Sequence, residues 1–180
     1  MAAAGHSSPG GFSMNSVPER SRSVTIRVPD ESALPVLASR LVAALPPLAF
    51  VALEGDLGAG KTTFVKAVAA AAGIDPSTVV SPTFGLIHEH GPAARGIRLV
   101  HADMYRLPDV AALRETGWED AVTQPGWVFV EWPSRIAAAL PADRLDVAIT
   151  IDSPQARTLT FTSHGRGHDP VVAALEAGMV

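Results

Sequence analysis

The sequence predicts an α/β domain with three layers and a mixed, mostly parallel sheet. The apolar run Leu48–Leu53 has the length and composition of a buried parallel strand. The stretch Gly55–Thr62, GDLGAGKT, follows it and fits the phosphate-loop pattern G-x-x-x-x-G-K-[ST]. Residues Thr63–Ala72 are typical of a helix that stops at Gly73. A strand, a glycine-rich loop and a helix in this order indicate a phosphate-loop NTPase-like domain.

The composition is that of one globular domain. The chain has 180 residues, of which 47% are hydrophobic, and a formal net charge of −4. The negative charge argues against a free-standing nucleic-acid binder, which usually has a basic surface. The absence of cysteine excludes disulfides and thiolate zinc sites and suits a reducing cytoplasm. The sequence contains neither a signal peptide nor an apolar run of roughly 20 residues, so we expect no membrane association.

The first residues differ from the rest of the chain. Residues 1–22 are rich in Gly, Ser and Pro and bury too little apolar surface to offset the entropy of ordering. We therefore predict a flexible N-terminal tail over residues 1–22 and a single domain over residues 23–180.

Hydrophobic patterning predicts the remaining elements. Before the loop, Ser23–Val28 alternates as a strand does, and a helix capped by Pro29–Ser32 runs to Ala44. After the loop, Phe84–His90 and Ile97–Asp103 are two strands that a short turn should pair antiparallel. The later elements are short helices over Val110–Val122 interrupted near Gly117, a strand over Gly126–Trp132, a helical turn over Pro133–Leu140, an edge hairpin of Arg144–Ile151 and Thr158–Ser163, and a helix over Pro170–Ala177.

The fixed residues of the phosphate-loop pattern each have a chemical reason. Glycines tolerate positive φ and leave room for a phosphate, so successive backbone N–H groups can converge on the anion. The following helix adds the positive end of its dipole. Lys61 places a cation on the terminal phosphates, and the Thr62 hydroxyl is suited to bind Mg²⁺. The predicted nucleotide-binding residues are Leu57, Gly58, Ala59, Gly60, Lys61, Thr62 and Thr63.

Hydrolysis of a nucleotide also requires carboxylates for the metal ion, and two acids end apolar strands. Asp103 follows Ile97–Ala102, and Glu131 follows Trp127–Val130. Ligands of open α/β sheets bind outside the carboxyl ends of the strands, where these acids should lie. We therefore predict that Asp103 and Glu131 act with Lys61 in catalysis and with Thr62 in metal binding. The alternative for either acid is a strand-end carboxylate that caps the next helix.

Further candidates flank these residues. Ser81-Pro82-Thr83 follows the loop helix, where switch segments of phosphate-loop enzymes contact the γ-phosphate, although an ordinary Ser-Pro turn is the alternative. Arg106 could supply a charge to the transition state or form a surface ion pair. Trp132 could pack in the core or have an exposed functional role.

Together these residues resemble the TsaE (YjeE) family, the ATPase of bacterial threonylcarbamoyladenosine modification of tRNA. The matching stretches are GDLGAGKTTF at Gly55–Phe64, SPTF at Ser81–Phe84, HADMYRL at His101–Leu107 and VEWP at Val130–Pro133. The phosphate loop alone is generic. Its combination with the other three motifs, in this order and spacing, is specific to the family.

The resemblance implies roles for several residues and names partners. It implies that the loop binds ATP, that Thr62 and Glu131 bind Mg²⁺, and that Asp103 lies close to the metal. It places the adenine near Glu31. It further implies that the protein works with TsaB and TsaD in the cytoplasm, where ATP hydrolysis resets the complex. TsaD performs the transfer onto tRNA, so this chain should engage tRNA only indirectly.

Other nucleotide-dependent functions were weighed against this one. A GTPase is excluded because its Asn-Lys-x-Asp motif cannot form when the only lysines are Lys61 and Lys66 and the only asparagine is Asn15. A small-molecule kinase remains an alternative, although the arginines are scattered rather than clustered as in a kinase lid. A nucleotide-gated binding module without useful turnover also remains. Because Arg106 is the only arginine evident near the motifs, we expect a weak ATPase that partner proteins accelerate.

Overall fold

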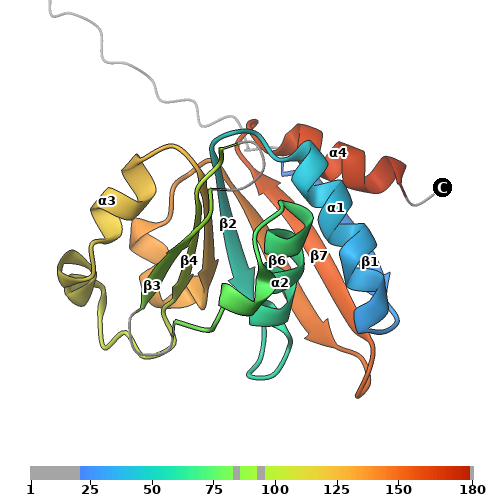
Figure 1. Ribbon diagram of the computed structural model, residues 1–180, viewed down its shortest axis with the longest axis horizontal. Coiled ribbons are helices and arrows are strands. Elements are labelled where there is room, and N and C mark those ends of the chain that lie inside the picture. Colours follow the sequence, from blue (N-terminus) through green and yellow to red (C-terminus); the bar gives the residue numbers. More distant parts are fainter. Residues whose placement is uncertain (1–20, 83–85, 93–95, 179–180) are drawn as a thin grey trace, which may run out of the picture.

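The computed structural model describes residues 21–82, 86–92 and 96–178, which form one sheet with helices on both faces (Figure 1). The seven-stranded sheet has the order β1-β7-β6-β2-β5-β4-β3. The strands are β1 (Ser23–Val28), β2 (Ala49–Glu54), β3 (Ile87–His90), β4 (Leu99–Asp103), β5 (Trp127–Glu131), β6 (Arg144–Ile151) and β7 (Arg157–His164). The helices are α1 (Leu34–Ala44), α2 (Lys61–Ala71), α3 (Trp118–Thr123) and α4 (Asp169–Ala177). The 3-10 helices are η1 (Glu31–Ala33), η2 (Pro76–Thr78), η3 (Val110–Glu115) and η4 (Pro133–Ala139).

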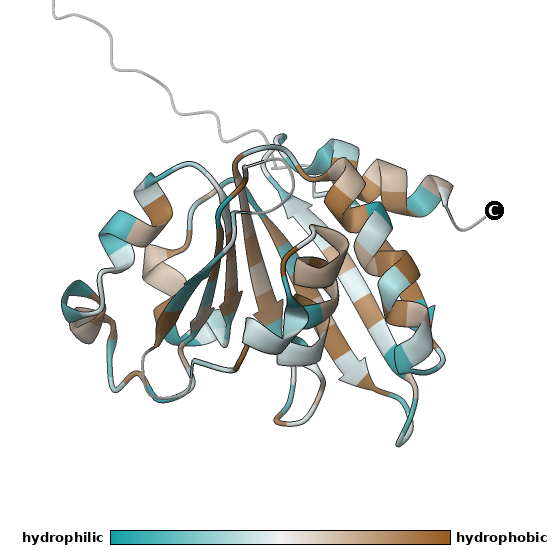
Figure 2. Cartoon of the chain, viewed as in Figure 1, coloured by the Kyte–Doolittle hydropathy of each residue, from teal (hydrophilic) through white to brown (hydrophobic). Residues whose placement is uncertain are grey.

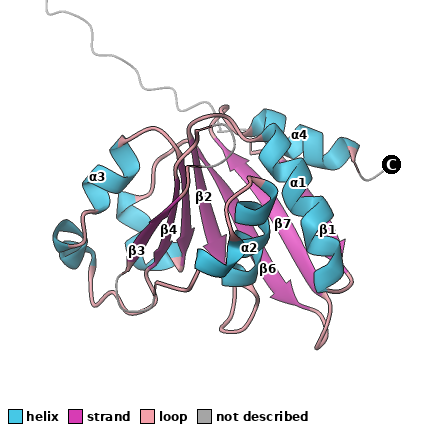
Figure 3. Ribbon diagram, in the orientation of Figure 1, coloured by secondary structure: helices cyan, strands magenta, loops and turns pink. Residues whose placement is uncertain are grey.

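The centre of the sheet is parallel and both outer parts are antiparallel. β2 pairs in parallel with β5 and with β6, and β4 pairs in parallel with β5. β3 pairs antiparallel with β4, as the short connection between them predicted. The prediction of a mixed α/β sheet in three layers is therefore confirmed, and Figure 3 shows the helices flanking the sheet.

The predicted hairpin of β6 and β7 is confirmed, but its predicted position at a sheet edge is wrong. The two strands pair antiparallel, β6 also pairs with β2, and β7 pairs with β1. β1 lies beside β7 in the sheet. Its buried residues Val24 and Val28 point to one face of the strand, so β1 adds to the core on that face. The edge strands of the described sheet are β1 and β3.

The helices divide the core into two clusters, one on each face of the sheet. On one face, α1, α2 and α4 contribute Leu41, Phe64 and Leu175 to the first cluster. On the other face, Phe50 of β2 meets Trp118 of α3 edge-on, with ring centroids 6.0 Å apart. Because both faces are covered, β2 and β5 are apolar up to their final glutamates, and Figure 2 shows this concentration of hydrophobic residues in brown.

The corner between β1 and α1 is fixed by a side-chain cap. The Ser32 backbone N–H donates to the Asp30 carboxylate at 2.9 Å, so Asp30 caps η1, and α1 begins only afterwards at Leu34. The predicted helix is therefore divided into a 3-10 turn and an α-helix. This turn carries Glu31, the residue that the family resemblance placed near the adenine.

Arg22, which the sequence assigned to the N-terminal tail, is joined to the fold. Its carbonyl accepts a hydrogen bond from the Ser163 N–H at 2.8 Å, and its guanidinium pairs with Glu176 at 2.5 Å. Residues Met1–Arg20 lie outside the described residues. In the described parts of the chain, no helix has the length and apolar composition that a membrane crossing requires.

Two truncations test where the N-terminal tail ends. Removal of Met1–Arg20 is expected to leave the midpoint of thermal unfolding nearly unchanged, because polar terminal segments make few ordered contacts. Removal through Arg22 also deletes an exposed ion pair and a backbone hydrogen bond, together worth about 1 kcal/mol, and should lower the midpoint by roughly 2–4 °C. Calorimetry of both proteins measures the difference. A large destabilisation by the shorter truncation would contradict the prediction.

Candidate functional site

The predicted site residues meet at the carboxyl edge of the central strands. β2, β4 and β5 run parallel, and their ends lie side by side (Figure 1). In the register of the sheet, Asp103 is paired with Glu131, and Glu131 is also paired with Leu53. The loop of residues 55–60, here called the β2–α2 loop, starts from the end of β2. The sheet therefore brings both predicted acids to the base of this loop.

The conformation of the β2–α2 loop requires its glycines. Gly58 and Gly60 have φ values of 82° and 101°, in the region that L side chains rarely adopt. Gly55 has a φ of 153°, and a Cβ atom there would lie 2.5 Å from the carbonyl oxygen of Ile149 in β6. Glycine is therefore needed both for backbone shape and for close packing against β6.

Lys61, the first residue of α2, donates hydrogen bonds back to carbonyls at the start of the β2–α2 loop. Its Nζ donates to the carbonyls of Gly55 at 2.6 Å and Asp56 at 3.1 Å, and the residue is only 4% exposed. Burial lowers the pKa of Lys61, while the neighbouring carboxylates, Glu131 foremost, act in the opposite direction. The lysine is thus a buried cation held by backbone carbonyls beside the predicted acids.

Trp132 covers this cation. The Lys61 Nζ lies 3.8 Å from the centroid of the Trp132 ring, and the centroids of the Tyr105 and Trp132 rings are 4.9 Å apart. Trp132 has φ 61° and ψ 50°, which is uncommon for a bulky residue and marks a constrained backbone. The ring is partly buried against the second core cluster and also lines the cavity described below, so it packs against the core, and its functional role stays a prediction.

Thr62, Glu131 and His101 form a buried chain of hydrogen bonds. The Thr62 hydroxyl donates to Glu131 Oε1 at 2.7 Å, and His101 Nε2 lies 2.8 Å from the same oxygen. Glu131 is 3% exposed and His101 is fully buried. One carboxylate oxygen is thus held by two side chains, which fixes the orientation of Glu131 toward Thr62.

Asp103 is held in a similar way. The Ser81 hydroxyl donates to Asp103 Oδ2 at 2.8 Å, and the Tyr105 N–H donates to Oδ1 at 3.0 Å. The contact with Ser81 joins the predicted switch segment to the predicted metal site. Thr83, the other switch candidate, lies outside the described residues.

These side chains surround a cavity of about 470 Å³. Its lining consists of Leu57, Gly58, Gly60, Lys61, Thr62, Thr63, Ser81, Asp103, Tyr105, Arg106, Glu131 and Trp132. Every predicted site residue except Ala59, Glu31 and Thr83 is among them. Ala59 is buried within the β2–α2 loop itself. Arg106 is exposed and lines this cavity, so it lies where a transition-state charge would be useful.

The oxygen donors of the cavity suit a hard cation. Thr62, Glu131 and Asp103 offer one hydroxyl and two carboxylates, the ligands that Mg²⁺ prefers. Within the described residues, no group of three or more His, Cys, Asp or Glu side chains is arranged to hold a metal ion. The site therefore fits an ion that completes its shell with water and phosphate oxygens, as Mg²⁺ usually does.

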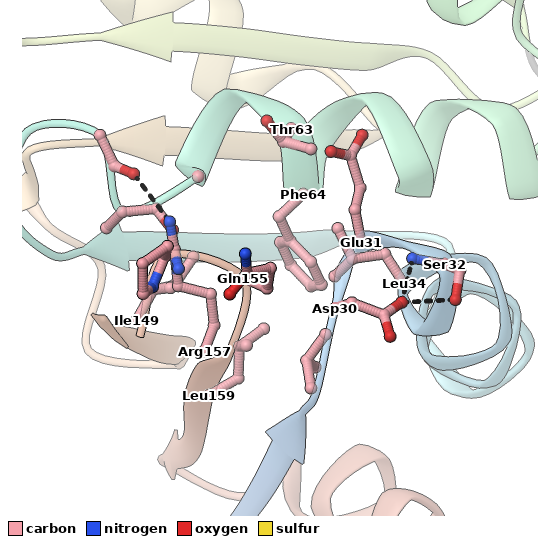
Figure 4. Close-up of a pocket in the computed structure, with 15 residues that line it drawn as sticks. Asp30, Glu31, Ser32, Leu34, Thr63, Phe64, Ile149, Gln155, Arg157 and Leu159 are labelled. Atoms are coloured by element: carbon pink, nitrogen blue, oxygen red, sulfur yellow. Dashed lines mark hydrogen bonds between the residues drawn. The ribbon is translucent and has the colours of Figure 1, made fainter. Parts of the chain in front are cut away.

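A second cavity of about 460 Å³ adjoins the first, since Gly58, Gly60 and Thr63 line both. Figure 4 shows this cavity between the β2–α2 loop, the corner of β1 and η1, and the start of β7. Glu31 lines it, and Phe64 and Leu159 supply apolar wall. The two cavities therefore adjoin along the β2–α2 loop and the start of α2, and each has a volume typical of small-molecule sites.

A family model described as threonylcarbamoyl adenosine biosynthesis protein TsaE matches residues 28–159. The chain belongs to the TsaE family. Curated relatives named tRNA threonylcarbamoyladenosine biosynthesis protein TsaE include that of Bacillus subtilis, 38% identical over 65% of this chain and 71% of the relative. That of Aquifex aeolicus is 41% identical over 55% of this chain and 68% of the relative. The chain thus belongs to a family of tRNA threonylcarbamoyladenosine biosynthesis.

The fold of this TsaE-family chain also resembles a solved structure. The crystal structure of Bacillus subtilis YdiB superposes with a TM-score of 0.70 at 28% sequence identity. The match covers 89% of this chain and 99% of that one. The mixed α/β architecture described above is therefore shared with a known structure over nearly its whole length.

Sequence patterns missed two residues of this TsaE-family site. His101 begins the HADMYRL motif but received no predicted role, because its contact with Glu131 depends on the register of β4 and β5. Arg157, at the start of β7, donates to the carbonyl of Ala59 in the β2–α2 loop at 3.0 Å. Because Arg157 follows Ala59 by nearly a hundred positions and belongs to no motif, only the folded chain could place it there.

Proposed function

We propose that this TsaE-family protein binds and hydrolyses Mg·ATP in support of threonylcarbamoyladenosine formation on tRNA. The observation that carries the proposal is the convergence of Lys61, Thr62 and Glu131 on one cavity beside a glycine-rich loop. The β2–α2 loop is then a phosphate loop. In this proposal a TsaD-type partner transfers the threonylcarbamoyl group, as the family resemblance implies.

The chain's own residues divide the work of hydrolysis. Lys61 would exchange the carbonyls of Gly55 and Asp56 for phosphate oxygens, which offer a stronger charge-assisted partner. Thr62 and Glu131 would hold Mg²⁺, with Asp103 close to it. The bound ion would neutralise charge that develops on the phosphates. His101 and Ser81 would keep the two carboxylates in place through the hydrogen bonds already formed.

The second cavity would take the base and the ribose. Glu31 supplies a carboxylate that could accept a hydrogen bond from the exocyclic amino group of adenine, as the family resemblance implies. Phe64 and Leu159 supply apolar surface for the faces of a ring. This division supports ATP as the substrate of the proposed reaction.

The proposal includes partner proteins of the TsaB–TsaD type. Lys61 and Arg106 are the cations among the lining residues of the first cavity, and Arg106 is exposed. A cation supplied by a partner can accelerate such a reaction by roughly 10³–10⁵-fold. Tyr105, Arg106 and Trp132 line this cavity, and Tyr105 and Arg106 are exposed, so we propose these three residues, with Ser81, as the surface that responds to the partners.

Phosphate release by the purified chain tests the proposed function. The chain alone is expected to turn over ATP slowly, and addition of TsaB and TsaD together should increase the rate at least tenfold. Each partner added singly, and partners without this chain, serve as controls. Fast turnover alone with no stimulation would contradict the partner-dependent mechanism. Transfer of phosphate to a small acceptor instead of water would favour a kinase.

A further inference from the structure

We propose that Arg157 is a positioning residue that fixes the β2–α2 loop so that the Gly60 N–H points into the phosphate cavity. The proposal rests on the proposed function, because it concerns how the same loop would bind phosphates. It adds a second loop-binding cation, supplied by the C-terminal hairpin rather than by any of the sequence motifs.

The contacts of Arg157 are all with backbone carbonyls. Its Nε donates to the Ala59 carbonyl at 3.0 Å, and Nη2 lies 3.5 Å from the Gly58 carbonyl. Its Nη1 donates to the carbonyls of Ser153 at 2.8 Å and Ala156 at 2.9 Å. Within the described residues, no carboxylate forms an ion pair with this guanidinium. A planar fork of donors can bind several carbonyls at once, which a lysine ammonium cannot do in the same geometry.

Peptide geometry connects these contacts to the phosphate cavity. In a trans peptide, the carbonyl and the following N–H point in opposite directions. Since Arg157 binds the Ala59 carbonyl, the Gly60 N–H must point away from Arg157. In the described structure, the Gly60 N–H has no hydrogen-bond partner, and Gly60 lines both cavities. An unpaired donor in this orientation is what a phosphate oxygen requires.

The peptide between Gly58 and Ala59 is oriented in the same way as the next one, with its carbonyl toward Arg157. The Gly58 carbonyl faces Arg157, and the Ala59 N–H on the opposite side donates to the Asp56 carbonyl at 3.0 Å. The two successive peptides of the loop are therefore held from the outside by Arg157. Figure 4 shows Arg157 beside the β2–α2 loop, on the side of the second cavity.

The hairpin that carries Arg157 is itself rigidly attached. β6 and β7 pair along their full lengths, and the Ser153 hydroxyl accepts a hydrogen bond from the Ala156 N–H at 3.0 Å in the turn between them. The same hairpin packs against the start of the loop, where Ile149 leaves room only for glycine at position 55. Hence one hairpin fixes both ends of the loop, which is how rigid elements preorganise a binding site.

Three variants test the proposal through ATP affinity, measured by titration calorimetry on the full chain. Arg157→Gln removes the charge and most of the donors, and should weaken ATP binding about tenfold, the size of a lost charge-assisted hydrogen bond. Arg157→Lys keeps the charge without the fork and should fall between Gln and wild type. Arg144→Gln, at the other end of the same hairpin, is the matched control and should stay within about twofold of wild type.

A second measurement separates positioning from general stability. The amide resonance of Gly60 should move in nucleotide-free Arg157→Gln and Arg157→Lys, but not in Arg144→Gln. In the wild-type chain, the same resonance should move when pyrophosphate is added. Unchanged ATP affinity in a folded Arg157 variant, or a Gly60 resonance that ignores pyrophosphate, would overturn the proposal.

ATP affinity of the wild-type chain and of Arg157→Gln separates a failure of the role of Arg157 from a failure of the proposed function. If the wild-type chain does not bind ATP, the proposed function fails. If the wild-type chain binds ATP and Arg157→Gln binds it equally well, only the role of Arg157 fails. If Arg157→Gln does not fold, Arg157→Lys and the pyrophosphate titration of the wild-type chain decide.

Discussion

Replacement of Lys61 by alanine is expected to weaken ATP binding strongly and to abolish hydrolysis while the fold persists. The Lys61 ammonium forms no hydrogen bond with a carboxylate in the described structure, and its donors are used on the carbonyls of Gly55 and Asp56. Burial lowers its pKa, which means that the protein interior opposes the charge rather than depending on it. A lysine that faces phosphates contributes charge-assisted hydrogen bonds, so affinity should fall roughly 10–100-fold.

Lys66→Ala is the matched control for Lys61→Ala, because Lys66 lies on the same helix and is exposed. Calorimetric titration with ATP and thermal unfolding of both variants give the comparison. The Lys66 variant should match wild type in both measurements. ATP affinity that is equal to wild type in Lys61→Ala would show that the β2–α2 loop is not a phosphate loop.

Replacement of Glu131 or Asp103 is expected to slow ATP hydrolysis while ATP binding persists. Glu131→Ala and Asp103→Ala should still bind ATP, because the β2–α2 loop and Lys61 remain. Mg²⁺-dependent hydrolysis should fall about 10²-fold or more, since the electrostatic stabilisation of the reacting phosphates is lost. Phosphate release at saturating ATP measures the loss, and calorimetry checks that binding persists.

Folding controls are needed because both acids are buried. Glu131→Gln and Asp103→Asn keep the shape and one accepting oxygen but remove the charge, so they should fold normally and lose hydrolysis alike. Glu119→Ala, on the exposed side of α3, is the control for a general loss of acidic charge. Wild-type hydrolysis in both the Glu131 and the Asp103 variants would remove these residues from the metal site.

Elements with local sequence signals could be predicted before the structure was known. The glycine pattern of Gly55–Thr62 specifies backbone conformations that other residues disfavour, and the structure contains that loop between β2 and α2. The uninterrupted apolar runs of β2 and β5 indicated strands buried on both faces. Because parallel strands end at one edge, the acids Asp103 and Glu131 could be expected beside the loop before the register was known.

The pairing of distant strands was decided only by tertiary structure. The alternating pattern of β6 and β7 predicts a hairpin but does not state which strands lie beside it. The folded sheet places the hairpin between β1 and β2, and this brings the turn of the hairpin to the β2–α2 loop. Periodicity reports how one segment is buried, whereas the choice of neighbour depends on the packing of the whole chain.

The side-chain contacts of the site also depend on which strands lie beside one another. The contacts of Glu131 with Thr62 and His101 follow from the order β2-β5-β4, and the contact of Arg157 with Ala59 follows from the place of the hairpin. Each of these contacts joins residues that are far apart in sequence. A hydrogen bond requires its atoms to lie within about 3 Å of each other, a condition that only the assembled sheet can fulfil.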